Sequence, residues 1–195
     1  MELIKLPEFP AIKVEDIPPC SALLYYGVMP LTSWYANHRF KHPYKPGAYH
    51  AAFYIWNGLS LQVGKFHTIQ KIEKDFSERK RIDVVAYPNI TDKVRKDMAT
   101  AAFDDADEPK LGFNKSTYGV FDFLRFEPLL RWLPRSKKEI CSENTYRMFA
   151  KCGIKVAEKP PKTEVAPWNI FEYAVAHPEE CEVYTVWVGK DYKYK

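Results

Sequence analysis

Several short segments alternate hydrophobic and polar residues, or are rich in β-branched and aromatic side chains, and are bounded by Pro, Gly, Asn or Asp. Such segments are typical of β-strands, and they fall at 20–28, 49–57, 59–64, 82–87 and 182–189. The second and third are joined by Asn57-Gly58, a dipeptide that strongly favours a two-residue β-hairpin. The pattern therefore predicts an antiparallel sheet in which residues 49–57 and 59–64 are neighbours.

A second pattern, with apolar residues at helical spacing, predicts helices. Apolar positions 94, 98, 101 and 102 predict a helix from Thr91 to about residue 103, followed by an acidic loop at 104–110. Ser136-Lys-Lys-Glu139 matches a capping box and predicts a helix that ends at Cys152, with Gly153 in the C′ position; a start at Cys141 is the alternative. Residues 167–176 form a third predicted helix, and 118–132 stay open between helix and loop. Strands in an antiparallel sheet with helices packed against it define the α+β class.

The composition fits one domain with a buried core. The chain has 195 residues, of which 46% are hydrophobic and 28% charged, and a chain of this length buries roughly 70% of its unfolded surface. Prolines gather in residues 1–19, which we expect to form an extended arm. Residues 20–190 are the predicted domain, and 191–195 are a basic tail.

Charge and hydropathy narrow the choice of partners. Lys and Arg number 29 against 25 for Asp and Glu, a net charge of +4, and the basic stripe of a duplex-binding domain is missing. We therefore expect no nucleic-acid partner. No apolar run approaches the ~20 residues of a membrane span, and the first residues lack the apolar region of a signal peptide. The expectation is a protein that is made in the cytoplasm and has no membrane span.

The spacing of cysteines and histidines argues against the common metal motifs. The four cysteines, at positions 20, 141, 152 and 181, form no Cys-x-x-Cys pair, and without a signal peptide disulfides are not expected. His38 and His42 have no carboxylate or cysteine at ligand spacing, so we predict no metal and no organic cofactor. The open question is whether one thiol is reactive while the others belong to the core.

Cys141 is the candidate for a reactive thiol. It lies at or near the start of a predicted helix, where exposed N–H groups and the helix dipole lower a thiol pKa. A cysteine nucleophile also needs a base or ion-pair partner, and a polar group that orients that partner. His50, at the start of a strand, and Gln62, on the strand that returns from the turn, are the candidates for these roles. The alternative for each is structural. Cys141 would pack with Met148 and Cys152 in the core, His50 would be a satisfied strand residue, and Gln62 would lie on an exposed face.

The order of these residues resembles the permuted papain-like amidases of the YiiX/YaeF kind, in the NlpC superfamily. That family has a His-x-x-x-Tyr-Ile strand before a Gly turn and, much later, a helix that opens with Cys-Ser-Glu-Leu. This chain has His50-Ala-Ala-Phe-Tyr-Ile-Trp-Asn-Gly and Ile140-Cys-Ser-Glu-Asn. Ala166-Pro-Trp-Asn-Ile-Phe resembles the segment that follows the family's helix. The chain departs from the family in its first strand, which begins Pro19-Cys-Ser-Ala rather than Gly-Asp, and at Asn144, which replaces Leu.

The resemblance implies a circularly permuted papain-like fold, with an antiparallel sheet or half-barrel packed against helices, and a cysteine hydrolase that needs no metal or organic cofactor. Cys141 would be the nucleophile and His50 the base or imidazolium partner. Gln62 would be the orienting residue, where relatives often have Glu. Tyr118 and Ser142 would support the thiol.

The implied substrates are amide bonds of peptidoglycan peptides, cleaved through an acyl-enzyme on Cys141. Two alternatives stay open. One is an acyltransferase or thioesterase on lipid or other acyl substrates, and the other is an inactive binding or assembly protein, such as a component of a phage particle. Because no signal peptide is predicted, delivery to the cell envelope in a virion is one expected route, with phage tail or virion proteins as partners.

Overall fold

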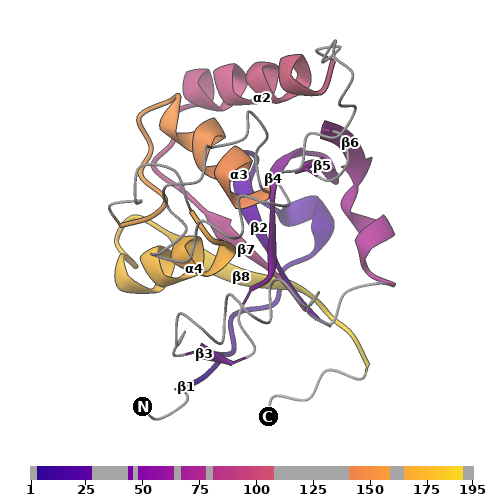
Figure 1. Cartoon of the computed structure of the whole chain (residues 1–195), viewed down its shortest axis with the longest axis vertical. Helices are drawn as coiled ribbons and strands as arrows, with labels where there is room; N and C mark the ends of the chain where they lie inside the picture. Colours follow the sequence, from indigo (N-terminus) through magenta and orange to yellow (C-terminus); the bar gives the residue numbers. More distant parts are fainter. Residues whose placement is uncertain are drawn as a thin grey trace, which may run out of the picture.

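The architecture is α+β, as the sequence predicts (Figure 1). In a computed structural model of the chain, the structure describes residues 4–27, 44–45, 48–63, 67–77, 81–107, 141–158 and 165–190. Within these residues a six-stranded sheet has the order β6-β5-β4-β2-β7-β8, and every neighbouring pair is antiparallel. Its strands are β2 (Ser21–Tyr26), β4 (His50–Trp56), β5 (Leu59–Val63), β6 (His67–Lys71), β7 (Arg81–Ala86) and β8 (Glu182–Val188). Two further short strands, β1 (Ile4–Lys5) and β3 (Tyr44–Lys45), pair in parallel.

Three helices of the described residues pack on one face of this sheet. They are α2 (Asp92–Asp107), α3 (Cys141–Ala150) and α4 (Pro167–Ala176), and Figure 1 shows α3 lying across the middle strands. Phe149 of α3 is fully buried, with its ring 5.5 Å from that of Phe53 on β4 and 4.8 Å from that of Tyr87. This apolar contact fixes α3 over β4, and so determines where the first residue of α3 meets the sheet.

The opposite face of the sheet is also covered. Leu23 and Tyr25 of β2 point to it, because successive side chains of a strand alternate between the two faces. They pack with Ile17 and with Ile72, which belongs to the short 3₁₀ helix η2 (Ile72–Asp75). A second 3₁₀ helix, η1 (Val14–Asp16), precedes Ile17. All six residues of β2 are buried, as expected for a strand with cover on both faces.

The segment before β2 lies along β8. The Ile12 N–H donates to the Thr185 carbonyl at 3.0 Å, and the Thr185 N–H donates to the Pro10 carbonyl at 2.9 Å. Leu6 and Ile17 are 1% and 4% exposed. The predicted division of the chain into an arm, a domain and a tail stays a prediction.

The prediction of an acidic loop from residue 104 is wrong for residues 104–107, because α2 continues to Asp107. The reason is a buried polar cluster, here called the Asp105 cluster, formed by Asp105, His67, Asn144 and Arg147. The Asp105 carboxylate contacts a ring nitrogen of His67, and accepts hydrogen bonds from Asn144 at 3.1 Å and from Arg147 at 2.8 Å. These contacts tie the last turns of α2 to β6 and to α3.

The strand β6 is not predicted from the sequence, because its pattern of hydrophobic and polar residues is weak.

The C-terminal end of α3 follows the predicted pattern. Gly153 has a φ of +73°, the left-handed conformation that ends many helices. Its N–H donates to Ala150, and the Ile154 N–H donates to the Phe149 carbonyl at 3.1 Å. The predicted capping box at 136–139 and the open segment 118–132 lie outside the described residues.

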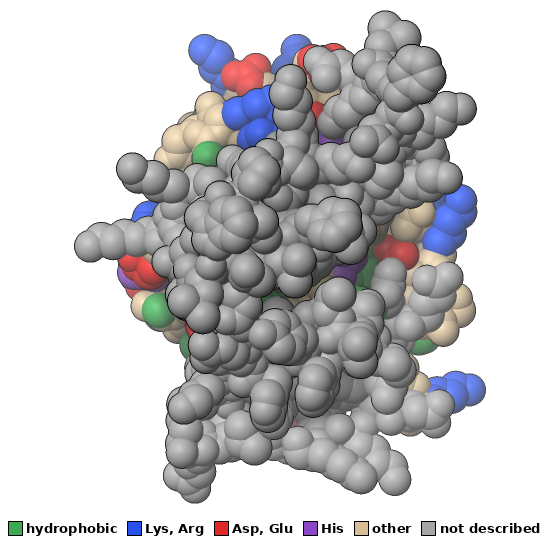
Figure 2. Space-filling view, in the orientation of Figure 1, with side chains coloured by type: hydrophobic (Ala, Val, Ile, Leu, Met, Phe, Trp, Pro, Cys, Tyr) green, Lys and Arg blue, Asp and Glu red, His purple; other side chains and the backbone are tan. Residues whose placement is uncertain are grey.

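The described helices and the described surface bear on two of the expectations about partners. None of the described helices is long and apolar enough to cross a membrane. On the described surface seen in Figure 2, Lys and Arg side chains lie interspersed with Asp and Glu. The absence of a nucleic-acid partner stays a prediction.

Candidate active site

The first turn of α3 brings the Cys141 thiol against the beginning of β4. Cys141 is the first residue of α3 and is 3% exposed. Its sulfur takes part in hydrogen bonds with the His50 side chain and with the backbone N–H groups of Ala51 and Ser142. Inside a helix, an N–H is taken by the carbonyl four residues earlier. The Ser142 N–H belongs to the first turn of α3, where N–H groups have no partner within the helix, and it lowers the pKa of the thiol.

These contacts lower the pKa of the Cys141 thiol. Burial is the largest single influence and acts in the opposite direction, because it disfavours the thiolate. The charge of His50, the hydrogen bond from its side chain, and the N–H groups of Ala51 and Ser142 together outweigh burial. The net result is a thiol that loses its proton more readily than an ordinary cysteine.

The other three cysteines show the reverse. Burial raises the pKa of Cys20 to about 11 and that of Cys181 to about 12, and it also raises the pKa of Cys152. Cys20 and Cys181 are as inaccessible as Cys141, at 1% and 4% exposed. All four are free thiols, and Cys152 is half-buried rather than part of the core interior. Because Cys20 and Cys181 are as buried as Cys141, burial does not explain the difference in pKa. What distinguishes Cys141 is its imidazole partner.

His50 and Gln62 form a direct hydrogen bond. His50 Nε2 lies 2.8 Å from Gln62 Oε1. β4 and β5 are adjacent antiparallel strands with Phe53 opposite Leu61, and the same register places Gln62 opposite Ala52, two residues from His50. The two residues are therefore a diagonal cross-strand pair, whose long side chains close the gap. The structure thus brings together Cys141, His50 and Gln62, whose catalytic roles stay predictions.

A buried polar network holds the Gln62 amide. Gln62 Nε2 lies 3.0 Å from Asp75 Oδ2, 2.7 Å from the Tyr25 hydroxyl and 3.1 Å from the Ser60 hydroxyl. Tyr25 donates to Asp75 Oδ2 at 2.9 Å, and the Gln70 amide donates to Asp75 Oδ1 at 3.0 Å. Gln62, Tyr25 and Asp75 are 7%, 0% and 4% exposed. Neither Tyr25 nor Asp75 is among the residues predicted from the sequence.

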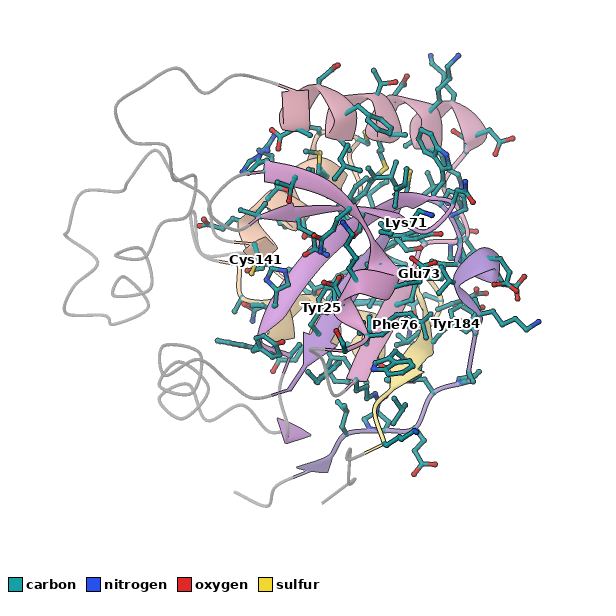
Figure 3. The ribbon with its side chains drawn as sticks, turned by 90° about the vertical axis from the view of Figure 1, so that its right-hand side faces the viewer. Tyr25, Lys71, Glu73, Phe76, Cys141 and Tyr184 are labelled. Atoms are coloured by element: carbon teal, nitrogen blue, oxygen red, sulfur yellow. The ribbon has the colours of Figure 1, made fainter. Side chains whose placement is uncertain are left out.

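The site lies at one side of the sheet. Figure 3 shows Cys141 at the end of α3 beside the strands and Tyr25 further into the sheet, while Lys71, Glu73 and Tyr184 lie on the other side of the view. Tyr25 is the register partner of His50, and their rings are 5.1 Å apart. The imidazole is therefore packed against the network that holds Gln62.

Ser142 anchors the first turn of α3 through its side chain. Its hydroxyl donates a buried hydrogen bond to the Val165 carbonyl, just before α4. The Ala166 N–H in turn donates to Asn169 Oδ1 at 2.9 Å, which caps α4. The residue just before α4 therefore holds the start of α3. Of the other predicted residues, Tyr118 lies outside the described part of the chain, as do His38 and His42.

One group of side chains among the described residues has the spacing of metal ligands. His177, Glu179 and Glu180 place their ligand atoms within 4.8 Å of one another, but both glutamates are exposed. Acidic surface groups of this kind are common without an ion. Among the described residues, Cys141 and His50 belong to no such group, and a thiol with one imidazole falls short of the three or four protein ligands of a zinc site.

Comparison with known proteins indicates the fold. No family model and no curated protein matches the sequence. A similar solved structure is that of the metalloprotein YiiX from Escherichia coli O157:H7, DUF1105, with a TM-score of 0.55 at 11% sequence identity. The match covers 87% of this chain and 98% of the YiiX chain. At this identity the likeness concerns the fold alone, so the chain has a distant fold relation to YiiX, a protein of the kind that the motifs resemble.

Proposed function

We propose that this chain is a cysteine hydrolase that cleaves an amide or related acyl bond through a thioester on Cys141. One observation carries the proposal. Of the four thiols, it is the one beside His50 that has a lowered pKa, and His50 is in turn held by Gln62. A nucleophile, its base and a residue that orients the base are the parts that covalent catalysis by cysteine needs.

The reaction has two halves. The Cys141 thiolate attacks the carbonyl carbon, a C–S bond forms, and the C–N bond breaks as the His50 imidazolium gives its proton to the leaving amine. Water then attacks the thioester while His50 takes one of its protons. The C–S bond breaks, the acid is released, and the thiolate–imidazolium pair is restored.

The tetrahedral intermediate needs donors for its oxyanion. N–H groups in the first turn of a helix have no partner within the helix, and donors aimed at a developing negative charge lower the barrier. The Ser142 N–H already donates to the Cys141 sulfur in the resting site. Because it lies beside the attacking sulfur, we assign the Ser142 N–H as a donor to the oxyanion.

The mechanism has no step through a metal. YiiX carries the description metalloprotein, but the described residues around Cys141 supply a thiol and one imidazole, without a third protein ligand. These residues do not fit a metal centre, whereas they fit an ion pair between thiol and imidazole.

For the substrate we propose peptide or isopeptide bonds of peptidoglycan, which the family resemblance implies. An acyltransferase would form the same thioester on Cys141 and pass the acyl group to an acceptor other than water, whereas a thioesterase would form it by breaking a C–S bond of the substrate, with a thiol as the leaving group. No described feature favours that second activity over hydrolysis. The chemistry at Cys141 is common to both.

The test is to incubate purified peptidoglycan with the protein and identify the released fragments by mass spectrometry. The proposal expects peptides with new amine and carboxyl ends, and no release by Cys141→Ala. Cys181→Ala is the matched control, because it removes a thiol of similar burial that lies away from His50, and it should retain activity. Intact peptidoglycan together with cleaved thioester or lipid substrates would favour the acyl-transfer alternative. No turnover of any acyl substrate would favour a binding protein.

A further inference from the structure

We propose that Asp75 is a positioning residue of this site, which fixes the orientation of the Gln62 amide and thereby determines which ring nitrogen of His50 carries the hydrogen and which is left as the base for Cys141. The inference rests on the proposed function. It adds a residue of the 3₁₀ helix η2 to a site whose other residues lie on β4, β5 and α3.

Asp75 allows one orientation of the Gln62 amide. A carboxylate only accepts hydrogen bonds, whereas a hydroxyl both donates and accepts. The hydroxyls of Tyr25 and Ser60 would therefore suit either orientation of the amide. Asp75 Oδ2, 3.0 Å away, suits only the orientation with the nitrogen facing it. The oxygen of Gln62 must then face His50, as it does at 2.8 Å.

The Gln62 amide in turn determines where the hydrogen of the neutral His50 ring lies. Because Gln62 presents an acceptor, His50 Nε2 must carry a hydrogen. In the neutral ring this leaves Nδ1 as the base for the thiol proton. When Nδ1 has taken that proton, both ring nitrogens donate, and Gln62 still accepts. A flipped amide would instead point its N–H₂ group at Nε2, which disfavours the imidazolium and with it the thiolate.

The negative charge of Asp75 lies on the side of the Gln62 amide that faces away from His50. Asp75 is 4% exposed and accepts hydrogen bonds from Gln62, Tyr25 and Gln70. A buried carboxylate held by donors favours a cation on the far side of the amide. Among the described residues, Tyr25 on β2 and Cys141 on α3 are titratable groups in contact with His50, and α3 also carries the buried Glu143.

The test measures the rate of alkylation of Cys141 by iodoacetamide against pH, with peptide mapping by mass spectrometry. In Asp75→Asn the introduced amide offers both a donor and an acceptor, so the Gln62 amide is free to flip. We expect the midpoint of the rate profile to move upward by about one pH unit, and the rate at pH 6 to fall about tenfold. Asp83→Asn is the matched control. It changes another buried carboxylate, 0% exposed on β7 and paired with Arg81, and should leave the midpoint in place.

A compensating variant separates positioning from folding. In Gln62→Glu combined with Asp75→Asn, the introduced carboxylate accepts from His50 and the introduced amide donates to that carboxylate. The charge has moved one residue towards His50, with donors and acceptors still matched. We expect the low midpoint of the rate profile to return in the double variant. If Asp75→Asn acted by damaging the fold, the second substitution would add to the damage and the midpoint would stay high.

The outcomes distinguish the two proposals. If the rate profile of Cys141 has a low midpoint in the unchanged protein, and neither Asp75→Asn nor Asp83→Asn moves it, the role of Asp75 is overturned. The proposed hydrolase activity is not. A Cys141 that is no more reactive than the other thiols overturns both. If Asp75→Asn does not fold, the ¹⁵N shifts of His50 in the unchanged protein decide. A neutral ring with the hydrogen on Nε2 supports the inference, and one with the hydrogen on Nδ1 overturns it.

Discussion

His50 and Gln62 are joined by a 2.8 Å hydrogen bond although they are not register partners. A diagonal pair of this kind depends on side-chain length, because the backbone does not bring the two residues face to face. The geometry explains why a long polar side chain stands at position 62. A shorter amide there would not reach the ring.

Gln62→Leu should weaken the thiolate of Cys141. The ring of His50 would lose the acceptor that stabilises its charged form, so we expect alkylation of Cys141 at pH 6 to slow about tenfold. Gln70→Leu is the matched control, since Gln70 donates to Asp75 but not to His50, and its effect should be smaller. Equal rates in the unchanged protein and in Gln62→Leu would show that Gln62 does not orient His50.

His50→Ala should turn Cys141 into an ordinary buried cysteine. Burial raises the thiol pKa, and His50 supplies the charge and the hydrogen bond that oppose it. We therefore expect the pKa of Cys141 in this variant to lie above the ordinary value, as it does for Cys20 and Cys181. Turnover of substrate should be lost at the same time. Retained selectivity for Cys141 at acidic pH would contradict the assigned ion pair.

The Asp105 cluster should contribute to stability. Asp105→Ala removes the acceptor shared by His67, Asn144 and Arg147, and we expect the free energy of unfolding to fall by about 1–3 kcal/mol, because buried donors are left without an acceptor. Asp104→Ala, on the exposed side of the same helix, should cost less than about 0.5 kcal/mol. Urea denaturation of both variants measures the difference, and equal losses would show that the cluster is not a stabilising clamp.

The same cluster predicts a pH dependence. Burial tends to raise the pKa of the Asp105 carboxyl, but the hydrogen bond with His67 and the charge of Arg147 outweigh it and hold that pKa well below its usual range. A carboxyl with a lowered pKa stabilises the fold above the pKa of the unfolded chain, which is about 3.9 for Asp. Its contribution should be lost as the pH falls below that value. The stability difference between the unchanged protein and Asp105→Ala should therefore be constant at neutral pH and shrink in acid.

Gly153→Ala should destabilise the chain through its backbone alone. Gly153 has a φ of +73°, and nothing lies within 4 Å of the Cβ that the substitution would add. We expect a loss of about 1 kcal/mol from the left-handed conformation. Gly153→Asn should lose less, because Asn adopts this conformation more readily than Ala. A loss as large for Asn as for Ala would point to a cause other than backbone conformation.

Much of the sheet could be predicted because its signals are local. The Asn57-Gly58 turn pairs β4 with β5 and so brings Gln62 near His50, and the prolines around α4 mark both of its ends. Gly153 likewise marks the end of α3. These features depend on the conformational preferences of a few adjacent residues, so they are visible without the fold.

The rest of the site depends on contacts that are distant in the sequence. Asp75 stands in a short charged stretch after β6, where nothing local indicates that it is buried; its position is determined by Tyr25 and Gln62, 50 and 13 residues away. In the sequence alone, Asp105 belongs to a run of acidic residues that predicts a loop. Its burial becomes evident only in the fold, where His67 and Arg147 contact it. A buried carboxylate can be identified only from the groups that donate hydrogen bonds to it. For Asp75 and Asp105 these groups lie on other strands and helices, and most of them are distant in the sequence.

The rates at which iodoacetamide modifies the four cysteines of the unchanged protein, followed from pH 5 to 9 by peptide mapping, test the central claim most directly. A thiolate beside an imidazolium should make Cys141 react much faster than Cys20, Cys152 and Cys181 at about pH 6. Its rate profile should have a midpoint well below the ~8.5 of free cysteine. Four cysteines that react at similar slow rates below pH 7 would contradict the claim and leave Cys141 a structural residue of the core.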